Sequence, residues 1–427
     1  MTQVYTVPRP IFDTLEHLSD LHKKCQVKTP RSVITVWLKE CLGDYFELLP
    51  RAAINEYHQA LMFLYSYRGS PDTFNAYRRE IERFIQWSWF IHKKSIITLR
   101  RLDIEEFIEF AQHPPKTWIS TKIVSRFFNQ DGERIVNPEW KPFIVKVSKK
   151  ASQDGVHAKK GNFKLSQQAL KQIFAILGTF YNALIQEEAT DVNPILQIRQ
   201  KSKFIQKQSS PPMIRRLSTL QWKTVLECTE ALALENPEVH RRTLFMMQCL
   251  YGMYLRISEL SASKRWTPKM ADFFRDADGN WWFKTVGKGN KMRQIAVSSE
   301  MLQALKDYRE YLGLTSLPSP DDTSPLIPKS RGQGPISSTP IIRRLVQGCF
   351  NAAVEKLKDQ NQPEEAEMLR SATVHWLRHT GISDDVKVRP REHVRDDAGH
   401  SSSAITDRYI DVELKERSKS ARNKSLS

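Results

Sequence analysis

The sequence has few cysteines and glycines and no long apolar run. Its five cysteines are scattered, with no CxxC pair, so neither a disulfide framework nor a thiolate zinc site is expected, and a reducing cytoplasm fits. Glycine makes up 16 of 427 residues, which favours helices over glycine-rich nucleotide-binding folds. The longest uncharged apolar stretches, such as 243–255, are shorter than the ~20 residues of a membrane span. The first residues lack the pattern of an export signal. We therefore expect a cytoplasmic protein that does not contact a membrane.

Positively charged residues are in clear excess. The chain carries 65 Lys and Arg against 48 Asp and Glu, a formal net charge of +17. Such a surface suits a polyanion, because nucleic acid releases condensed counterions when it binds a basic protein. Residues 141–164 alone contain seven lysines against a single aspartate. We therefore expect a polyanionic partner such as nucleic acid, a property that ribosome-associated and membrane-surface proteins share.

Apolar periodicity predicts helices through most of the chain. Residues 1–50 form a helical N-terminal extension of unknown role, and residues 51–198 a second helical region. The clearest boundary is 199–216, with six basic residues, no acidic ones and a Ser-Ser-Pro-Pro core. This segment is either a solvated linker or a stretch that follows DNA across a hinge. The lysines expected to contact DNA phosphates are Lys149, Lys150, Lys159, Lys160, Lys201 and Lys203.

The second half begins with a helix capped by Ser218 and continues with a helix expected over 243–260. The best strand pattern follows it, because Asp278-Gly279 and the Gly-Lys-Gly-Asn segment 287–290 are turn signals between strand-like runs. Three short antiparallel strands are predicted there, and helices again after 298. The fold class is therefore mainly α with a small antiparallel β-sheet (α+β).

The last sixty residues hold the side chains that phosphoryl transfer without a metal requires. The segment TVHWLRHTG places His375 and Arg378 on one helical face. Gly399-His400 follows, and Tyr409 comes nine residues after His400. Arginine donates paired, permanently charged hydrogen bonds to phosphate oxygens, histidine moves protons near neutral pH, and a phenol can be the covalent nucleophile.

Each residue also has a structural explanation when taken singly. Arg256 could pair with Glu259 one helical turn later, Lys288 could be a solvated lysine in a glycine turn, and Tyr409 could pack between helices. His375 and His379 have the HxxxH spacing of a zinc site, but no acidic base lies between them and no third ligand is evident. No metal is expected.

Taken in order, these residues resemble the tyrosine recombinase (phage integrase) family. Arg256 in LRISEL matches the first arginine of the family, and Lys288 in VGKGNKMR matches its hairpin lysine. HWLRHTG matches the second box, including the His-Thr that follows the arginine. Gly399-His400 and Tyr409 match the last box. The resemblance is specific over about 211–427 and weaker over 53–200.

The resemblance implies a catalytic set of Arg256, Lys288, His375, Arg378, His400 and Tyr409. Tyr409 would attack a scissile phosphate to give a 3′-phosphotyrosyl link, while Arg256, Arg378 and His400 hold the phosphate oxygens. Lys288 would protonate the departing 5′ oxygen, and His375 would help to accept the tyrosine proton. Glu259 would support Arg256. No cofactor is implied, because the tyrosyl link stores the phosphodiester energy.

The resemblance also implies a C-shaped clamp on double-stranded DNA and a nucleoid-associated location. A helical core-binding domain over 51–198 and a catalytic domain with a C-terminal tail over 217–427 would be joined by the basic linker 199–216. The tail would either dock on a neighbouring protomer or fray. We expect a tetramer on two DNA sites, with accessory directionality or host DNA-bending factors. The expected function is site-specific recombination, as the integrase of a mobile element. The alternatives are a type IB-like topoisomerase and a catalytically silent DNA-binding regulator.

Overall fold

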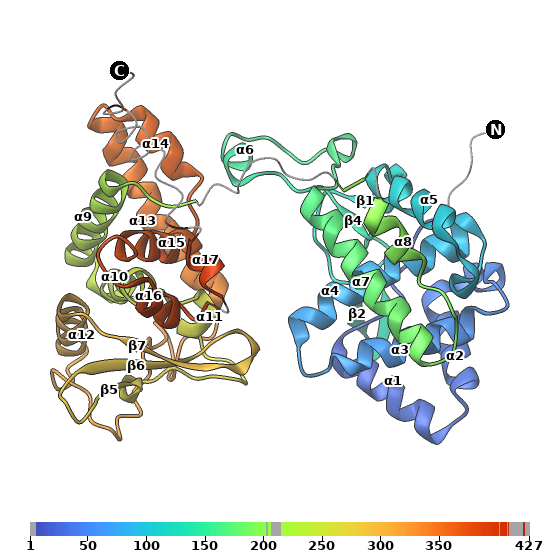
Figure 1. Cartoon of the computed structure of the whole chain (residues 1–427), viewed down its shortest axis with the longest axis horizontal. Helices are drawn as coiled ribbons and strands as arrows, with labels where there is room; N and C mark the ends of the chain where they lie inside the picture. The colour runs from blue at the N-terminus through green and yellow to red at the C-terminus, as the bar shows by residue number, and fades with distance from the viewer. Residues whose placement is uncertain are drawn as a thin grey trace, which may run out of the picture. The chain divides into compact units, whose positions relative to one another are not determined.

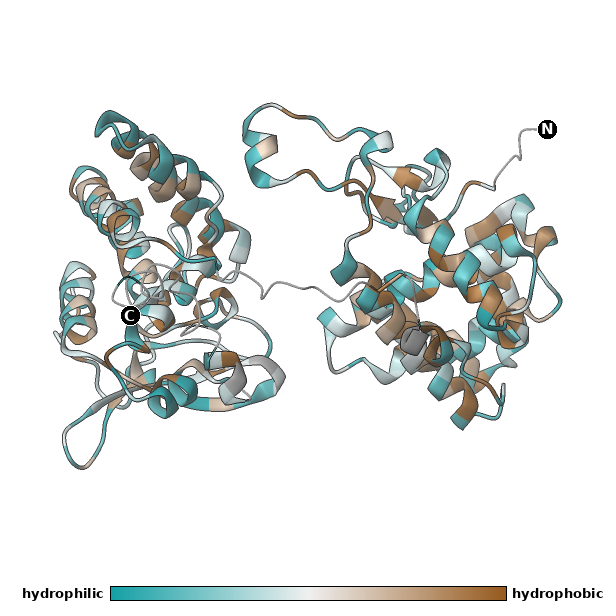
Figure 2. Ribbon diagram, turned by 45° about the horizontal axis from the view of Figure 1, so that its top comes forward, coloured by the Kyte–Doolittle hydropathy of each residue, from teal (hydrophilic) through white to brown (hydrophobic). Residues whose placement is uncertain are grey.

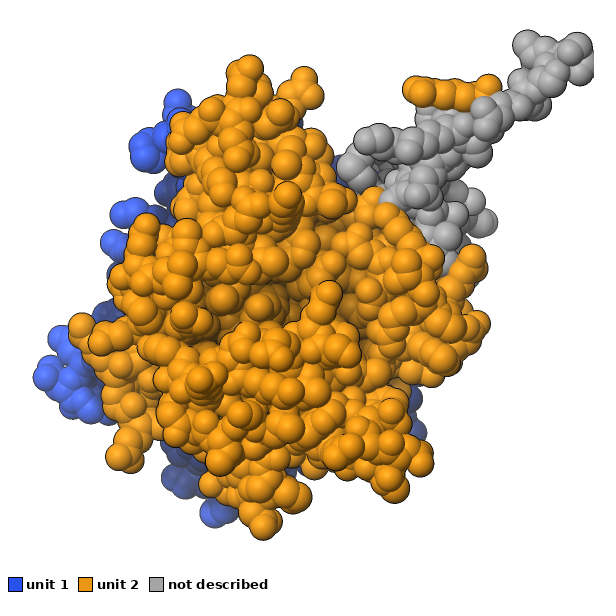
Figure 3. Space-filling view, turned by 90° about the vertical axis from the view of Figure 1, so that its left-hand side faces the viewer, with its two compact units in different colours: residues 1–209 blue, residues 210–427 orange. Residues whose placement is uncertain are grey.

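The computed structural model describes residues 6–201, 204–205, 215–400, 402–407, 409 and 422, without the side chains at 199–201, 288 and 404. The chain divides into two compact units, unit 1 (residues 1–209) and unit 2 (residues 210–427), coloured separately in Figure 3. Helices dominate both units (Figure 1), which confirms the mainly α class. Within the described ranges, no helix is both long and apolar enough to cross a bilayer.

Unit 1 is a helical assembly around one hydrophobic core. Its α-helices are α1 (Leu15–Val27), α2 (Pro30–Leu42), α3 (Ala53–Ser66), α4 (Pro71–Gln86), α5 (Arg101–Gln112), α6 (Lys149–Gln153), α7 (Gln167–Gln186) and α8 (Pro194–Lys201). Short 3₁₀ helices are η1 (Gly43–Leu48), η3 (Ile96–Thr98), η4 (Lys116–Trp118) and η5 (Lys160–Asn162), and η2 (Trp87–His92) is a π-helix. Apolar residues gather where these helices face one another (Figure 2).

The segment before α1 is part of this core. Ile11 and Phe12 are fully buried, and their backbone N–H groups donate to Glu82 Oε1 at 2.8 and 3.1 Å. Trp37 Nε1 and Tyr57 Oη both donate to the carbonyl of Ile11 at 2.8 Å. Because buried backbone groups need such partners, these four hydrogen bonds fix the segment between α2, α3 and α4. Residues 6–50 therefore share one core with the helices that follow.

Unit 1 also contains strands, although the sequence analysis placed its only good strand signal in the second half. β2 (Phe127–Gln130) and β3 (Glu133–Val136) form an antiparallel hairpin, and β1 (Ile119–Ser120) pairs in parallel with β4 (Phe143–Ile144). The hairpin turns at Asp131 and Gly132, whose φ angles are 53° and 85°. Two left-handed residues in succession match the twist of the flanking strands. These four short strands lie within 119–144, part of the region 51–198 that was expected to be helical.

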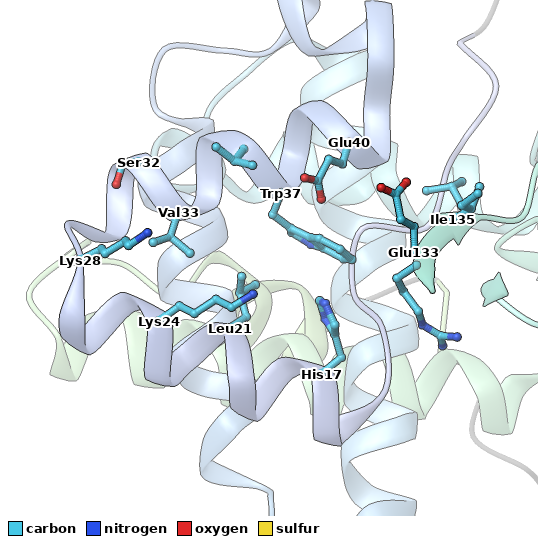
Figure 4. A pocket seen from close by; sticks show the side chains of 13 residues that line it. His17, Leu21, Lys24, Lys28, Ser32, Val33, Trp37, Glu40, Glu133 and Ile135 are labelled. Carbon is cyan, nitrogen blue, oxygen red and sulfur yellow. The ribbon is translucent and has the colours of Figure 1, made fainter. Parts of the chain in front are cut away.

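A groove of about 830 Å³ lies on unit 1 between α1, α2 and β3 (Figure 4). The rings of His17 and Trp37 lie 4.4 Å apart in its wall, and Lys24, Lys28 and Glu133 line it. None of the residues that the sequence singled out for chemistry lines this groove. The predicted chemistry must therefore be sought in unit 2.

Unit 2 combines a group of helices with a three-stranded sheet, which lies at one side of the unit (Figure 1). Its helices are α9 (Thr219–Glu235), α10 (Pro237–Gly252), α11 (Ile257–Leu260), α12 (Ser299–Tyr311), α13 (Thr339–Asp359), α14 (Pro363–Arg370), α15 (Val374–Asp385), α16 (Arg391–Ala398) and α17 (Ser403–Asp407), with the turns η6 (Met270–Asp272) and η7 (Lys288–Asn290). Ser218 caps α9 as predicted, because its hydroxyl accepts the N–H of Gln221 while Gln221 reaches back to the backbone of Ser218.

The sheet has the order β5-β6-β7. Its strands are β5 (Phe273–Arg275), β6 (Trp281–Val286) and β7 (Met292–Ala296), and both pairings are antiparallel. This confirms the three strands and both turns predicted from the sequence. Phe283 pairs with Ile295, and both side chains are fully buried on the face that meets the core. The β6–β7 turn carries the segment that contains Lys288.

Candidate active site

The chain changes direction just before Arg256. The continuous helix expected over 243–260 is wrong, because α10 ends at Gly252 and Tyr254 adopts a left-handed φ of 50°. Arg256 becomes the N-cap of the short helix α11. Its backbone N–H donates to Glu259 Oε2 at 2.8 Å, and its Nη1 donates to Glu259 Oε1 at 2.9 Å. The guanidinium is thereby oriented while 28% of its side chain stays exposed.

Glu259 is shared between two arginines. Arg293 on β7 donates Nη1 and Nη2 to the two carboxylate oxygens at 2.7 and 2.8 Å, and its Nε donates to the carbonyl of Asp397 at 2.9 Å. Burial would raise the pKa of Glu259, but the hydrogen bonds and charges of Arg293 and Arg256 outweigh it, so that the pKa is lowered. Glu259 therefore stays ionised and holds both guanidiniums in place.

Arg293 was not anticipated from the sequence, although its strand carries a signal for it. Side chains alternate between the two faces of a strand. Arg293 is two residues from the buried Ile295 and therefore lies on the core-facing side of β7. A charged residue at an inward position needs a buried partner of opposite charge, and Glu259 is that partner.

The absence of a side chain at Gly287 lets the β6–β7 hairpin approach these three residues. A Cβ there would lie 3.0 Å from Arg293 Nη1 and 3.3 Å from Glu259 Oε1. The next residue, Lys288, opens η7, and its side chain lies outside the described part of the structure. The backbone of Lys288 is thus adjacent to the Arg256–Glu259–Arg293 cluster, and its catalytic role stays a prediction.

Arg378 lies one turn into α15 and is 2% exposed. Its Nη2 donates to the carbonyl of Ala398 at 2.6 Å, and its Nη1 donates to the carbonyl of Tyr254. Burial, together with the charges of Arg256 and Arg293, lowers the pKa of Arg378 to about 9. Both hydrogen bonds go to neutral oxygens, so the positive charge remains available to an anion.

α15 packs unusually close to α10. Gly381 lies one turn after Arg378, and a Cβ on Gly381 would come within 2.1 Å of the backbone oxygen of Tyr251. Gly252, at the end of α10, is not packed so closely. A Cβ on Gly252 would make only an ordinary 3.6 Å contact with Met301 Sδ. The contact at Gly381 therefore sets how near Arg378 lies to the end of α10.

Tyr409 is 7% exposed and lies among imidazoles. Its Oη is 2.5 Å from His379 Nδ1, and its ring stacks on that of His400 with a centroid distance of 5.8 Å. His400 Nδ1 lies 2.9 Å from Thr406 Oγ1. The ring of His375 meets that of His379 edge to face at 4.3 Å. Tyr409 is therefore held against α15 by its contact with His379. From the sequence, His379 was noted only for its zinc-like spacing from His375 and for its place in the HWLRHTG motif.

The imidazoles are kept neutral by their surroundings. Burial, followed by the charges of Arg378, Arg256 and Arg293, lowers the pKa of His400 to about 4. Burial, followed by His375 and Arg378, lowers the pKa of His379 to about 3. A cluster that disfavours added positive charge favours a bound anion, as expected of a phosphate site.

Residues just before Gly399 support the same cluster. Asp397 is buried, and its carboxylate accepts from Arg389 Nη2 at 2.6 Å and from the N–H of Ala296 at 3.3 Å. Gly399 itself has a φ of 63°, and a Cβ on it would lie 2.9 Å from Arg293 Cδ. A glycine at this helix end thus lets α16 close onto β7 and delivers His400 to the site.

The structure brings five of the six predicted catalytic residues into one region of unit 2. These are Arg256, His375, Arg378, His400 and Tyr409. The predicted DNA-binding lysines are in unit 1. Lys149 and Lys150 begin α6, Lys159 precedes η5, and Lys160 donates to the carbonyl of Lys116 at 3.1 Å. Lys203 and the side chain of Lys201 lie outside the described residues.

The site lies in the part of the chain that matches a known family model. A family model described as "Phage integrase family" matches residues 215–416. This part of the chain is similar to the phage integrase family. The match contains Arg256, Arg378 and Tyr409 and confirms the recognition made from the motifs. It spans most of unit 2, whereas unit 1 lies outside it.

No curated protein matches the chain in sequence, but solved structures of recombinases are similar to it. XerH site-specific recombinase bound to palindromic difH substrate is 15% identical with a TM-score of 0.48, over 97% of this chain and 99% of that one. A lambda integrase dimer bound to a COC′ core site is 13% identical with a TM-score of 0.47, over 91% and 88%. The Tn1549 transposon integrase with circular intermediate DNA is 14% identical with a TM-score of 0.46, over 86% and 99%.

Proposed function

We propose that this chain is a site-specific DNA recombinase, the integrase of a mobile element, that cuts and rejoins duplex DNA through a phosphotyrosyl bond on Tyr409. One observation carries the proposal. Within the region that matches the phage integrase family, the guanidiniums of Arg256 and Arg378 lie in one cluster with a buried tyrosine whose hydroxyl contacts an imidazole.

The proposed reaction is a transesterification. Tyr409 Oη forms a bond to the scissile phosphorus, and the bond from phosphorus to the 5′ oxygen breaks, which leaves a 3′-phosphotyrosyl link. Arg256 and Arg378 donate to the non-bridging oxygens, on which negative charge builds up in the transition state. Pre-oriented donors of this kind each contribute on the order of 10²–10³ to the rate. The link of Arg256 to Glu259 supplies that orientation.

Protons must move as the bonds change. His400 is the third group that we assign to the phosphate oxygens. We assign His375, whose ring meets that of His379, to help accept the tyrosine proton. We assign Lys288 to the 5′ oxygen, which needs a proton when it leaves. Rejoining is the reverse reaction with a 5′-hydroxyl of the exchanged strand. Neither ATP nor a metal is required, because the tyrosyl ester conserves the energy of the bond that was cut.

Duplex DNA is the proposed partner of both units. The net charge of +17 and the lysine-rich segment 141–164 favour phosphate contacts, which position a protein without specifying sequence. We further propose that two DNA sites are joined by a tetramer, with the linker 199–216 between a core-binding and a catalytic domain, and that accessory DNA-bending or directionality factors assist.

Changing Tyr409 to phenylalanine should abolish covalent capture of DNA. Phe keeps the buried ring but removes the attacking oxygen. The test incubates the protein in EDTA with supercoiled plasmid that carries the DNA flanking this gene. A denaturing gel and mass spectrometry then detect any protein–DNA adduct. Tyr311→Phe is the matched control, because Tyr311 lies on α12 and is 40% exposed, and it should form the adduct normally.

The products separate the alternatives. An adduct on Tyr409 with joined recombinant DNA supports the proposal. Relaxation of the plasmid without joining would instead assign a topoisomerase. Tight, salt-dependent binding with no adduct would identify a DNA-binding regulator and overturn the assignment of Tyr409 as nucleophile.

A further inference from the structure

The hydroxyl of Tyr409 contacts a histidine that the proposed reaction has so far not used. His379 Nδ1 lies 2.5 Å from Tyr409 Oη, and the two ring centroids are 5.5 Å apart. His375 meets the same imidazole edge to face, with a centroid distance of 4.3 Å. The histidine in direct contact with the nucleophilic oxygen is therefore the second of the HxxxH pair.

The chemistry of the two partners sets the direction of this hydrogen bond. A phenol is protonated near neutral pH, so Tyr409 has a proton to donate. The lowered pKa of His379 means that its imidazole is neutral and has one nitrogen with a free lone pair. If Tyr409 donates, Nδ1 of His379 carries the lone pair and Nε2 carries the proton. His379 is then oriented to receive a proton from the attacking oxygen.

We propose that His379 Nδ1 holds the Tyr409 hydroxyl in the resting protein and takes up its proton as Tyr409 Oη bonds to phosphorus. This inference rests on the proposed function and moves the proton acceptor from His375 to His379. The O–H bond of Tyr409 breaks and an N–H bond forms at Nδ1. The electron pair left on Oη forms the bond to phosphorus, and the departing 5′ oxygen takes a proton from a separate donor, assigned above to Lys288.

Substrate binding makes His379 a stronger acceptor. Among the described residues, four groups face it, namely His375 and Arg378 from its own helix α15, His400 after α16, and Tyr409 after α17. A scissile phosphodiester brings one negative charge against Arg378, which offsets the positive charge that disfavours a protonated imidazole. The acceptor thus gains proton affinity when DNA occupies the site, whereas the tyrosine of the free protein stays protonated and unreactive.

Two substitutions separate proton acceptance from simple packing. His379→Asn places an amide oxygen near the position of Nδ1, so it can hold the hydroxyl but cannot take its proton. His379→Leu can do neither. Single-turnover cleavage of the plasmid DNA that gives the wild-type adduct is measured between pH 6 and 9. We expect both variants to cleave about 10²–10⁴-fold more slowly near pH 7, the usual contribution of a general base.

The pH profile distinguishes the two roles. Without an acceptor, cleavage by His379→Asn depends on the fraction of ionised Tyr409, which rises about tenfold per pH unit below a phenol pKa of ~10. The profile of this variant should therefore be much steeper than that of the wild type. An Asn variant that cleaves at the wild-type rate with an unchanged profile would show that His379 only fills space or orients, and would overturn the proposal.

A measurement without DNA keeps this inference separable from the proposed function. Nitrogen NMR of the free protein should show the Nε2–H tautomer of His379, with a Nδ1 signal that shifts in Tyr409→Phe. A protonated Nδ1 would overturn the inference even if wild-type cleavage occurs. Conversely, if the wild-type protein forms no adduct with DNA, that result would contradict the proposed function itself. Circular dichroism and salt-dependent DNA binding, compared with Tyr409→Phe, verify that the variants are folded.

Discussion

Alanine at position 381 is expected to destabilise unit 2 by about 3 kcal/mol or more, because the added Cβ has no space. It would lie 2.1 Å from the backbone oxygen of Tyr251 and 3.2 Å from Tyr254 Cδ1. A backbone oxygen cannot move aside as the end of a flexible side chain can, so α15 and α10 must separate. That separation would also pull Arg378 away from the carbonyl of Tyr254 to which it donates.

Urea or thermal unfolding of Gly381→Ala measures this effect. Gly348→Ala is the matched control, since Gly348 lies within the helix α13, is exposed, and has no atom within 4 Å of its would-be Cβ. Alanine there should stabilise the protein by about 0.5–1 kcal/mol through helix propensity alone. Equal stabilities of Gly381→Ala and the wild type would contradict the close packing of α10 and α15.

Glu259→Gln is expected to cost about 3–5 kcal/mol, the range for removing one partner of a buried ion pair. The glutamine keeps the shape of Glu259 but removes the charge that Arg293 and Arg256 share, and its amide N–H would point at guanidinium N–H groups. Glu259 is 1% exposed, and the Arg293 side chain is 9% exposed. Arg256 would lose its orientation, so cleavage should fall together with stability.

The same substitution should change the response to acid. The pKa of Glu259 is lower in the folded protein than the ordinary value of 4.5, so its contribution is fully present above about pH 4.5 and is lost as the pH falls through the folded value. Stability measured from pH 7 to pH 3 should therefore show a shallower acid loss in Glu259→Gln. Glu227→Gln is the control, because Glu227 and its partner Lys356 both lie on the surface, where ion pairs contribute little to stability. Its stability and its acid response should change far less than those of Glu259→Gln.

Turn chemistry explains both a success and an omission of the sequence-based prediction. Asp278-Gly279 between aromatic runs correctly predicted the β5–β6 hairpin. The same dipeptide at Asp131-Gly132 forms the β2–β3 hairpin but was passed over. Its flanking residues are mixed in polarity, and three of the four residues in β2 are exposed, so alternation gave little support to the turn signal.

The break before Arg256 could not be predicted from periodicity, because tertiary contacts decide it. Tyr254 adopts a left-handed conformation that costs a non-glycine residue on the order of 1 kcal/mol or more. It is held there by burial of its ring and by hydrogen bonds of its hydroxyl, which donates to Asp385 and accepts from Arg389 Nη1 at 2.9 Å. Those partners lie some 130 residues away in sequence, beyond the reach of local pattern.

The order of the sequence motifs predicted the family more reliably than local sequence patterns predicted the secondary structure. The types and order of Arg256, Arg378 and Tyr409 indicated the family before any fold was known, and the family match over 215–416 agrees. What the motifs lacked was contact information. Arg293 and His379 became candidates only when the structure placed them against Glu259 and Tyr409. Residue types suggest which reaction is possible, whereas the distances between side chains in the structure indicate which residues could take part in it.

The contact between Tyr409 and His379 also concerns how many subunits are needed to make one reactive centre. Both residues, together with Arg256 and Arg378, belong to a single polypeptide and meet without a contribution from another copy. Each subunit would then cut DNA in cis, with its own tyrosine. If copies assemble on paired DNA sites, as proposed above, that assembly would determine which subunits cut and in what order, and no copy would need a catalytic residue from another.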